Sequence, residues 1–155
     1  MTEIALYYDI DGCCHAHGTA KRNEHDQVRR FDGDGLFVWA SKLQPILDEF
    51  PELALFCHSH WGNLYSAEEM YQQLPTLLAL RTNAIVRPHN DRHMAIRAHA
   101  KESGVKNYVV LDDDAWAFPL GTPNIVIVPS ETGLSTPGAV EMLRNTIVAL
   151  QARPD

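Results

Sequence analysis

The stretch Leu6-Tyr7-Tyr8-Asp9-Ile10-Asp11-Gly12 decides the fold, because an apolar and aromatic run ends there in two carboxylates spaced two residues apart. Residues two apart share one face of a strand, so Asp9 and Asp11 are predicted to project together from the end of a buried strand, residues 4–8. Gly12 allows a sharp turn where the strand stops. Two close carboxylates repel each other, and the pair therefore predicts a cation, a shared proton or a phosphoryl group between them.

Length and composition predict one globular domain over residues 1–155. The chain is 45% hydrophobic and 21% charged, which is typical of a water-soluble fold. No apolar run approaches the ~20 residues of a membrane span, and no secretory signal precedes the first strand. We therefore expect a cytoplasmic protein without a membrane partner.

Cysteine content and net charge indicate the redox compartment and the mode of nucleic-acid binding that the protein can have. The three cysteines, two of them adjacent at Cys13 and Cys14, make a poor disulfide framework and favour free thiols in a reducing compartment. The formal charge of −7 argues against a broad non-specific grip on nucleic acid, although it leaves room for a local basic site.

Apolar periodicity and helix-capping residues predict strands that alternate with helices. Ser66 with Glu69 fits a capping box, and Asp91 fits the cap of a later helix. Residues 13–35 show little periodicity and predict a long loop or a small hairpin flap. The predicted strands are 4–8, 53–57, 108–111 and 125–128; the predicted helices are 36–50, 66–74, 92–103 and 137–151; and 75–86 holds a short helix followed by a strand.

This alternation predicts an α/β, three-layer, Rossmann-like fold with a mostly parallel central sheet. Ligands bind such sheets outside the carboxyl ends of the strands. Polar side chains follow three of the predicted strands at that edge: Asp9 and Asp11, then Ser59, then the run 112–114, which is three aspartates. The sequence therefore predicts one site assembled from three strand ends.

These motifs, in this order, resemble the haloacid dehalogenase (HAD) superfamily. Within it, Ser59 near Trp61, the Arg92-headed helix, the Leu-Asp-Asp-Asp strand end and the later Thr132-Gly133-Leu134-Ser135 are similar to the HAD domains of Swiss-army-knife RNA-repair proteins. The resemblance implies a HAD-like fold. The chain has no room for a large cap domain, since residues 13–35 offer only a flap.

The resemblance also implies roles for individual residues. Asp9 would be the nucleophile that forms an aspartyl-phosphate, and Asp11 the general acid and base. Magnesium would bind Asp9, the main-chain carbonyl beside Asp11, and an acid of the 112–114 run, with Asp113 preferred as direct ligand and Asp112 second.

Two further residues would contact the phosphoryl group. Ser59 would donate a hydrogen bond to one of its oxygens, and Arg92 would stabilise its developing charge. Arg97 and Lys101, one and two turns further along the same helix, are the alternatives to Arg92. Each of these side chains also has a plain structural interpretation, Ser59 as a strand-end hydroxyl and Arg92 as a surface charge.

Two groups of residues admit more than one interpretation. Trp61 and Trp116 are either core residues or the walls of a substrate entrance, whereas Trp39 lies on an apolar helical stripe that favours the core. A second group lies beside two strand ends and has ligand chemistry for zinc, but it lacks standard metal-site spacing. Its members are Cys13, Cys14, His15, His17, His58 and His60.

The resemblance therefore implies a magnesium-dependent phosphomonoesterase. A site without a cap is open to a large phosphorylated substrate, such as an RNA end, as well as to a nucleotide. The alternatives are a non-catalytic phosphate- or nucleotide-binding module of the same fold and a regulatory protein that binds metal through the cysteine and histidine group. The intact Asp9 and Asp11 favour the enzyme over the non-catalytic module.

Overall fold

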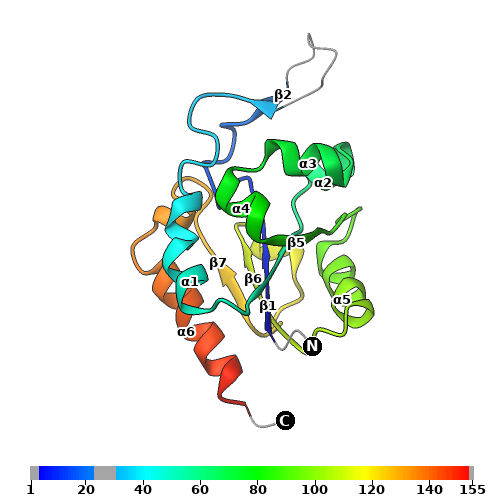
Figure 1. Ribbon diagram of the computed structural model, residues 1–155, viewed down its shortest axis with the longest axis vertical. Coiled ribbons are helices and arrows are strands. Elements are labelled where there is room, and N and C mark those ends of the chain that lie inside the picture. Colours follow the sequence, from blue (N-terminus) through cyan, green and yellow to red (C-terminus); the bar gives the residue numbers. More distant parts are fainter. Residues whose placement is uncertain (1–3, 23–30, 154–155) are drawn as a thin grey trace.

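The central sheet has five parallel strands in the order β5-β4-β1-β6-β7 (Figure 1). The computed structural model describes residues 4–22 and 31–153. The strands are β1 (Ile4–Tyr8), β4 (Ala54–Cys57), β5 (Thr82–Ile85), β6 (Asn107–Asp112) and β7 (Ile125–Ile127). The predicted α/β fold with a parallel sheet is confirmed.

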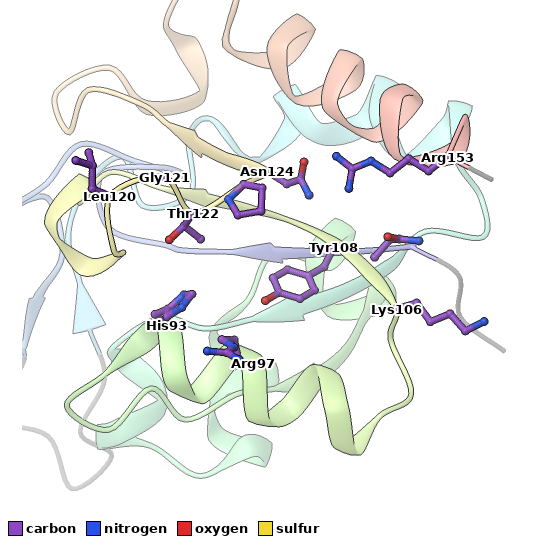
Figure 2. Close-up of a pocket in the computed structure, with 11 residues that line it drawn as sticks. His93, Arg97, Lys106, Tyr108, Leu120, Gly121, Thr122, Asn124 and Arg153 are labelled. Carbon is purple, nitrogen blue, oxygen red and sulfur yellow. The ribbon is translucent and has the colours of Figure 1, made fainter. Parts of the chain in front are cut away.

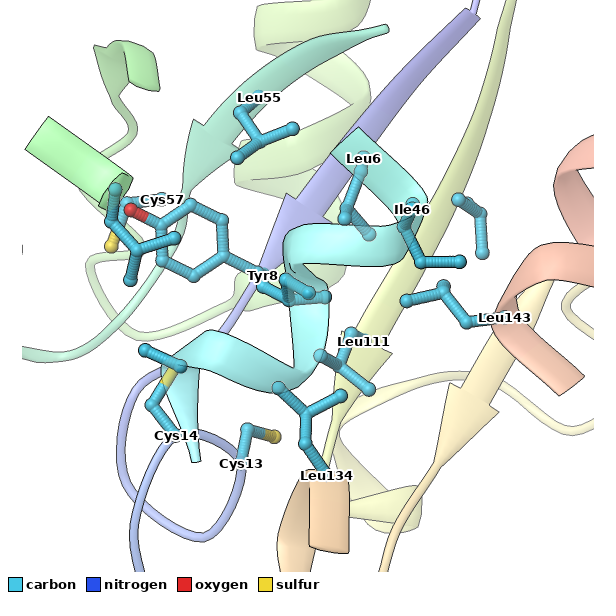
Figure 3. Close-up of a cluster of buried hydrophobic side chains, with 14 of the residues drawn as sticks. Leu6, Tyr8, Cys13, Cys14, Ile46, Leu55, Cys57, Leu111, Leu134 and Leu143 are labelled. Atoms are coloured by element: carbon cyan, nitrogen blue, oxygen red, sulfur yellow. The ribbon is translucent and has the colours of Figure 1, made fainter. Parts of the chain in front are cut away.

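Helices cover both faces of this sheet. On one face, η1 (Ala40–Leu43), α1 (Gln44–Glu49), α4 (Thr76–Arg81) and α6 (Ala139–Gln151) enclose the larger core, which Figure 3 shows around Leu6, Tyr8 and Leu111. On the other face, α5 (Arg92–Glu102) packs Ile96 and Ala100 against Tyr7. The alternation of side chains along β1 therefore separates two cores, and the three-layer prediction is confirmed.

Two short helices follow the carboxyl end of β4. They are α2 (Trp61–Leu64), which the sequence pattern did not predict, and α3 (Ala67–Gln73). The predicted capping box is present, since Ser66 accepts from the Glu69 N–H and the Glu69 side chain accepts from the Ser66 N–H. Asp91 caps α5 as predicted, by accepting a hydrogen bond from the Met94 N–H.

The insertion after β1 is a small flap. Its antiparallel strands are β2 (Lys21–Arg22) and β3 (Phe31–Asp32), while residues 23–30 of the predicted flap lie outside the described residues. Between β1 and β4, the described part of the chain holds only this hairpin, turns, η1 and α1, and therefore no large cap.

The predicted helix at 36–50 is wrong over its first half. Phe37 has a positive φ of 57°, its N–H donates to His15 Nδ1, and the N–H of Trp39 donates to the Cys14 carbonyl. These backbone donors hold the loop after β1 and are not available for a helix. The chain becomes helical only at Ala40, and the α-helix itself begins at Gln44.

Smaller differences also have backbone causes. The last helix begins at Ala139 rather than 137, because Gly138 has a left-handed φ of 83°. Two short 3-10 helices, η2 (Ala115–Ala117) and η3 (Gly133–Ser135), were not predicted. None of the described helices is long and apolar enough to cross a membrane.

Candidate active site

The register of the three central strands sets the floor of the site. Tyr8 pairs with Cys57 on one side and with Leu111 on the other. The following residues, Asp9, His58 and Asp112, therefore come level at the carboxyl edge of the sheet. All three are buried, and they are exposed by 2%, 0% and 0% respectively.

A hydrogen-bond network ties these strand ends to α5. Arg92 Nη1 donates to both carboxylate oxygens of Asp112, at 2.9 and 3.0 Å, and to Asp9 Oδ2 at 3.4 Å. His58 Nε2 lies 2.8 Å from Asp112 Oδ2, and Asp112 Oδ1 also accepts from the N–H groups of Asp113 and Asp114. Asp112 is thus surrounded by donors on both oxygens.

These surroundings separate the pKa values of the two buried carboxyl groups. Burial raises the pKa of Asp112, but the hydrogen bond from His58 and the charge of Arg92 outweigh it and bring that pKa down to about 2. The pKa of Asp9 is raised by burial and then by the negative charge of Asp112, which Arg92 offsets only in part. Burial lowers the pKa of His58, so the ring is neutral and donates to Asp112 through Nε2–H.

Asp11 occupies a different environment from Asp9. The strand ends at Tyr8, so the two-residue alternation does not extend to Asp11. Its carboxylate accepts from the indole N–H of Trp61, at 2.9 Å, and lies 2.8 Å from Nε2 of the buried His15. The expectation that Asp9 and Asp11 project together from the strand face therefore does not describe how the carboxylates are held.

The hydrogen bonds of His15 define its tautomer. Its Nδ1 accepts from the Phe37 N–H at 3.1 Å, so in the neutral ring the proton sits on Nε2 and points at Asp11. Burial raises the pKa of Asp11, but the hydrogen bonds from His15 and Trp61 outweigh burial and leave it below its usual value. The free protein therefore holds Asp11 as a carboxylate.

A candidate cation position lies between Asp9 and Asp113. Among residues 4–22 and 31–153, one group of metal-ligating side chains has all its ligand atoms within 4.8 Å of one another: Asp9, Cys13 and Asp113. Two carboxylates suit a hard cation such as Mg²⁺, whereas a thiol does not. Burial raises the pKa of Cys13, so it is a neutral thiol beside the carboxylates rather than a ligand for that ion.

Asp113 depends on Gly12 for its position. Gly12 has a left-handed φ of 76°, and a side chain added there would collide with the carboxylate of Asp113. Burial raises the pKa of Asp113, and a hydrogen bond with Ser130 works in the opposite direction. Asp112, whose oxygens are already occupied by donors, is less available to a cation than Asp113.

Some of the remaining predicted residues lie at the carboxyl edge of the sheet, and others lie elsewhere in the molecule. Ser59 is buried next to His58, and its hydroxyl accepts from the Trp61 N–H at 3.2 Å, which leaves the hydroxyl proton free to donate. Arg97 faces a separate pocket, and Lys101 is exposed on the last turn of α5. Of the three predicted cations, Arg92 is the one that contacts the strand ends.

The cysteine and histidine group is not a metal centre in the structure. His15 and His58 are used on Asp11 and Asp112, and His60 Nδ1 lies 3.2 Å from the Asn63 amide. No cluster built from these residues alone occurs in the described part of the chain.

The tryptophans have three different environments. Trp61 is both a core residue and part of the site, since it is buried, donates to Asp11 and stacks on Phe31 with ring centroids 4.3 Å apart. Trp39 is partly buried against the core, as predicted, although it precedes η1 rather than lying in a helix. Trp116 is exposed by 96% and is not a core residue.

The Thr132–Ser135 motif holds the loop after β1. The N–H of Leu134 donates to the Cys13 carbonyl at 3.0 Å. A Cβ at Gly133 would lie 2.6 Å from that carbonyl oxygen and 2.7 Å from the Trp39 ring, so only glycine fits there. This motif entered the sequence analysis only as part of a resemblance, and its contact with the loop was not predicted.

Sequence reasoning did not predict the partners of the two key carboxylates, His58 for Asp112 and His15 for Asp11. The available signals were that His58 directly precedes Ser59 at a strand end and that His15 lies four residues after Asp11.

One comparison with known proteins identifies a family. A family model described as "HAD domain in Swiss Army Knife RNA repair proteins" matches residues 5–139, which is most of the chain and includes every site residue described above. Searches of curated proteins and of solved structures gave no significant match.

Proposed function

Since the chain belongs to the family of HAD domains in Swiss Army Knife RNA repair proteins, which indicates a phosphohydrolase-type function, we propose that it is a magnesium-dependent phosphomonoesterase with Asp9 as nucleophile. The observation that carries this proposal is the setting of the Asp9 carboxylate. It is buried at a strand end, close to Asp113 and within hydrogen-bond distance of Arg92.

In the first step, a carboxylate oxygen of Asp9 attacks phosphorus, and the bond between phosphorus and the ester oxygen breaks. The raised pKa of Asp9 in the free protein opposes this step, because a protonated carboxyl is a poor nucleophile. Mg²⁺ held by Asp9 and Asp113 would supply the positive charge that keeps Asp9 ionised and offsets the charge of the phosphate.

Arg92 and Ser59 bind the transferring group. Asp112 fixes the guanidinium of Arg92 through two hydrogen bonds, so this charge is positioned before substrate arrives. Ser59 donates its free hydroxyl proton to a phosphoryl oxygen. Asp112 and His58 act as positioning residues, because they hold Arg92 and the 112–114 turn rather than contacting the substrate.

Asp11 transfers the proton in both halves of the reaction. It gives a proton to the leaving oxygen, and it then removes one from the water that attacks the phosphorus of the aspartyl-phosphate, which releases phosphate and restores Asp9. The ionised state that Trp61 and His15 impose suits the second half. The first half requires Asp11 to bind a proton, which the approach of an anionic phosphate favours.

The substrate class follows from the family and from the open site. The flap after β1 is small, so a phosphate at the end of an RNA strand, or on a nucleotide, can reach the carboxyl edge of the sheet. The family description favours an RNA end, and the acidic chain requires that any grip on RNA be local.

Turnover of an aryl phosphate, with and without Mg²⁺, tests the proposal. Wild type is compared with Asp9→Asn and with the matched control Asp114→Asn, which changes a neighbouring exposed aspartate that caps η2. We expect Mg²⁺-dependent turnover in wild type and the control, and a loss of about 10³-fold or more in Asp9→Asn, since an amide cannot attack phosphorus. RNAs with 5′- and 3′-phosphate ends and mononucleotides then identify the preferred substrate.

Turnover that is equal in wild type and Asp9→Asn would contradict the proposal. A wild-type protein that binds these phosphates and hydrolyses none of them would favour the non-catalytic module instead.

A further inference from the structure

A groove on the second face of the sheet lies away from the candidate active site. Five strands about 4.8 Å apart make a sheet roughly 19 Å wide, whereas one helix is only about 10 Å across. On this face α5 is followed by a crossover between β6 and β7 that contains just the short η2. The helix and the crossover leave between them a pocket of about 500 Å³, the size of a small-ligand site.

The walls of this groove combine an aromatic ring with positive charge. Figure 2 shows the ring of Tyr108, on β6, between Arg97 on α5 and the segment 122–124 on the opposite wall. Arg153, at the end of α6, extends toward Asn124, and Lys106 lies at the rim.

The charge of this groove is opposite to that of the protein. Among the described residues, its lining holds three cationic side chains and no carboxylate, in a chain of 20 acidic and 13 basic residues. A second cavity of about 570 Å³, between β7 and α6, is lined by Glu141 and by no cation of residues 4–22 and 31–153. Of these two cavities, the groove beside Tyr108 is therefore the one in which cationic side chains gather.

The cations of the groove also differ from Arg92 and Arg144 in their ion pairing. Within residues 4–22 and 31–153, Arg97, Lys106 and Arg153 make no ion pair with a carboxylate. By contrast, Arg92 is bound to Asp112, and Arg144 is bound to Glu49. Exposed guanidinium groups that pair with no carboxylate of the described residues, around a half-buried tyrosine ring, suit a ligand with both a phosphate and a planar base.

We propose that this groove binds a nucleotide unit, with its phosphate on Arg97 and Arg153 and its base against Tyr108. Asn107 and Asn124 line the same pocket and offer amide groups that can hydrogen-bond to base edges. The unit comes either from within the RNA strand whose phosphorylated end is the substrate, or from a free nucleotide. The first source rests on the proposed function; the second does not.

The position of the groove is compatible with one strand that reaches both sites. Tyr108 precedes Asp112 by four residues on β6, which separates them by about 13 Å. His93 lines the groove and directly follows Arg92 of the candidate active site, so the groove begins one residue from the phosphate-binding arginine. A strand only a few nucleotides long covers this distance.

Fluorescence polarisation tests the proposal. The probe is a short, labelled, single-stranded oligoribonucleotide with hydroxyls at both ends, because a strand without a terminal phosphate does not need the phosphatase site for binding. Arg97→Glu is compared with Lys101→Glu, which makes the same charge change on an exposed residue of the same helix outside the groove. We expect Arg97→Glu to weaken binding at least about tenfold and to lower the salt dependence, and Lys101→Glu to change it less than about twofold. Tyr108→Leu, which removes the stacking ring, is expected to weaken binding about tenfold.

Calorimetry with AMP separates the two sources. Binding of the oligonucleotide together with weak or absent binding of AMP supports a nucleotide within a strand, whereas comparable binding of AMP that is sensitive to Arg97→Glu supports a free nucleotide. Absence of binding by either probe, or equal effects of Arg97→Glu and Lys101→Glu, overturns the proposal.

Turnover of the aryl phosphate, measured on the same variants, distinguishes a failure of the groove proposal from a failure of the proposed phosphatase function. Arg97→Glu and Tyr108→Leu are expected to retain wild-type turnover, because both residues lie outside the site around Asp9. An inactive wild-type protein whose binding still depends on Arg97 would contradict the phosphatase and leave the groove intact.

Discussion

The two halves of the candidate active site are held in different ways. In the strand-end half, Asp9 and Asp112 are buried, and parallel strand register and Arg92 set their positions. In the loop half, Asp11 is partly exposed and is held by side chains from separate segments, His15 and Trp61. The difference teaches that strand register positions Asp9, whereas side-chain hydrogen bonds from separate segments position Asp11.

The same difference explains the opposite pKa directions of the two proposed catalytic carboxyl groups. Burial and a nearby carboxylate raise the pKa of Asp9, whereas donors from His15 and Trp61 outweigh burial and lower that of Asp11. Each direction is opposite to what the proposed first step needs. Binding of a cation and a phosphate would correct both.

Asp112→Ala gives the largest expected effect on stability, because it breaks the centre of the strand-end half. The substitution leaves His58 and Arg92 without their buried acceptor and is expected to cost about 3–5 kcal/mol in the free energy of unfolding. Urea denaturation measures it. Asp114→Ala, on the exposed neighbour that caps η2, is expected to cost about 1 kcal/mol, and an equal loss in both variants would contradict the central role of Asp112.

Addition and removal of Mg²⁺ tests the strand-end half through the proposed ligands of the ion, Asp9 and Asp113. Bound cation is expected to stabilise wild type by about 2.7 kcal/mol at a concentration roughly a hundredfold above Kd, and a chelator should reverse the gain. Thermal unfolding reads this out. Asp113→Asn should abolish the Mg²⁺-dependent shift, whereas the same shift in Asp113→Asn would place the ion elsewhere.

Gly12→Ala tests the junction between the halves. The left-handed backbone costs about 1–2 kcal/mol for an alanine, and the new methyl group would displace the carboxylate of Asp113. We therefore expect a moderate loss of stability in urea together with weaker binding of Mg²⁺. Gly104→Ala is the control, since Gly104 has a similar φ of 70° with no atom near its Cβ position, and it should lose stability alone.

Trp61→Phe probes the loop half and gives the smallest expected change in stability. It removes the indole donor to Asp11 and keeps an aromatic ring against Phe31, so the expected cost is about 1 kcal/mol by urea denaturation. Turnover is expected to fall because Asp11 loses a positioning contact. A loss of stability as large as that of Asp112→Ala would mean that both halves contribute equally to folding.

Local patterns predicted much of the fold. The strand at 4–8, the capping box at Ser66 and the cap at Asp91 are confirmed, because each depends on residues within a few positions of one another. The helix predicted at 36–50 failed because its first N–H groups bond to His15 and Cys14, more than twenty residues earlier. Apolar periodicity carries no information on such partners.

For the candidate site too, local patterns predicted positions in the chain but not contacts between distant residues. The strand-end acids and the residue at the head of α5 follow from where the elements end. The contacts of Asp112 with His58 and Arg92 depend on the pairing of strands that lie far apart in the chain, and no local spacing encodes them. The tautomer of His15 depends in the same way on a distant backbone donor, the N–H of Phe37.

Mass spectrometry of the acid-quenched protein after mixing with an aryl phosphate and Mg²⁺ tests the role of Asp9 most directly. Asp11→Asn lacks the proposed base for the second step, while the aryl leaving group of the first step departs with little help from an acid. In this variant we expect a phosphoryl adduct that peptide mapping places on Asp9 and that is absent from Asp9→Asn. An adduct on another residue, or turnover without Asp9, would contradict the assignment of Asp9 as the nucleophile.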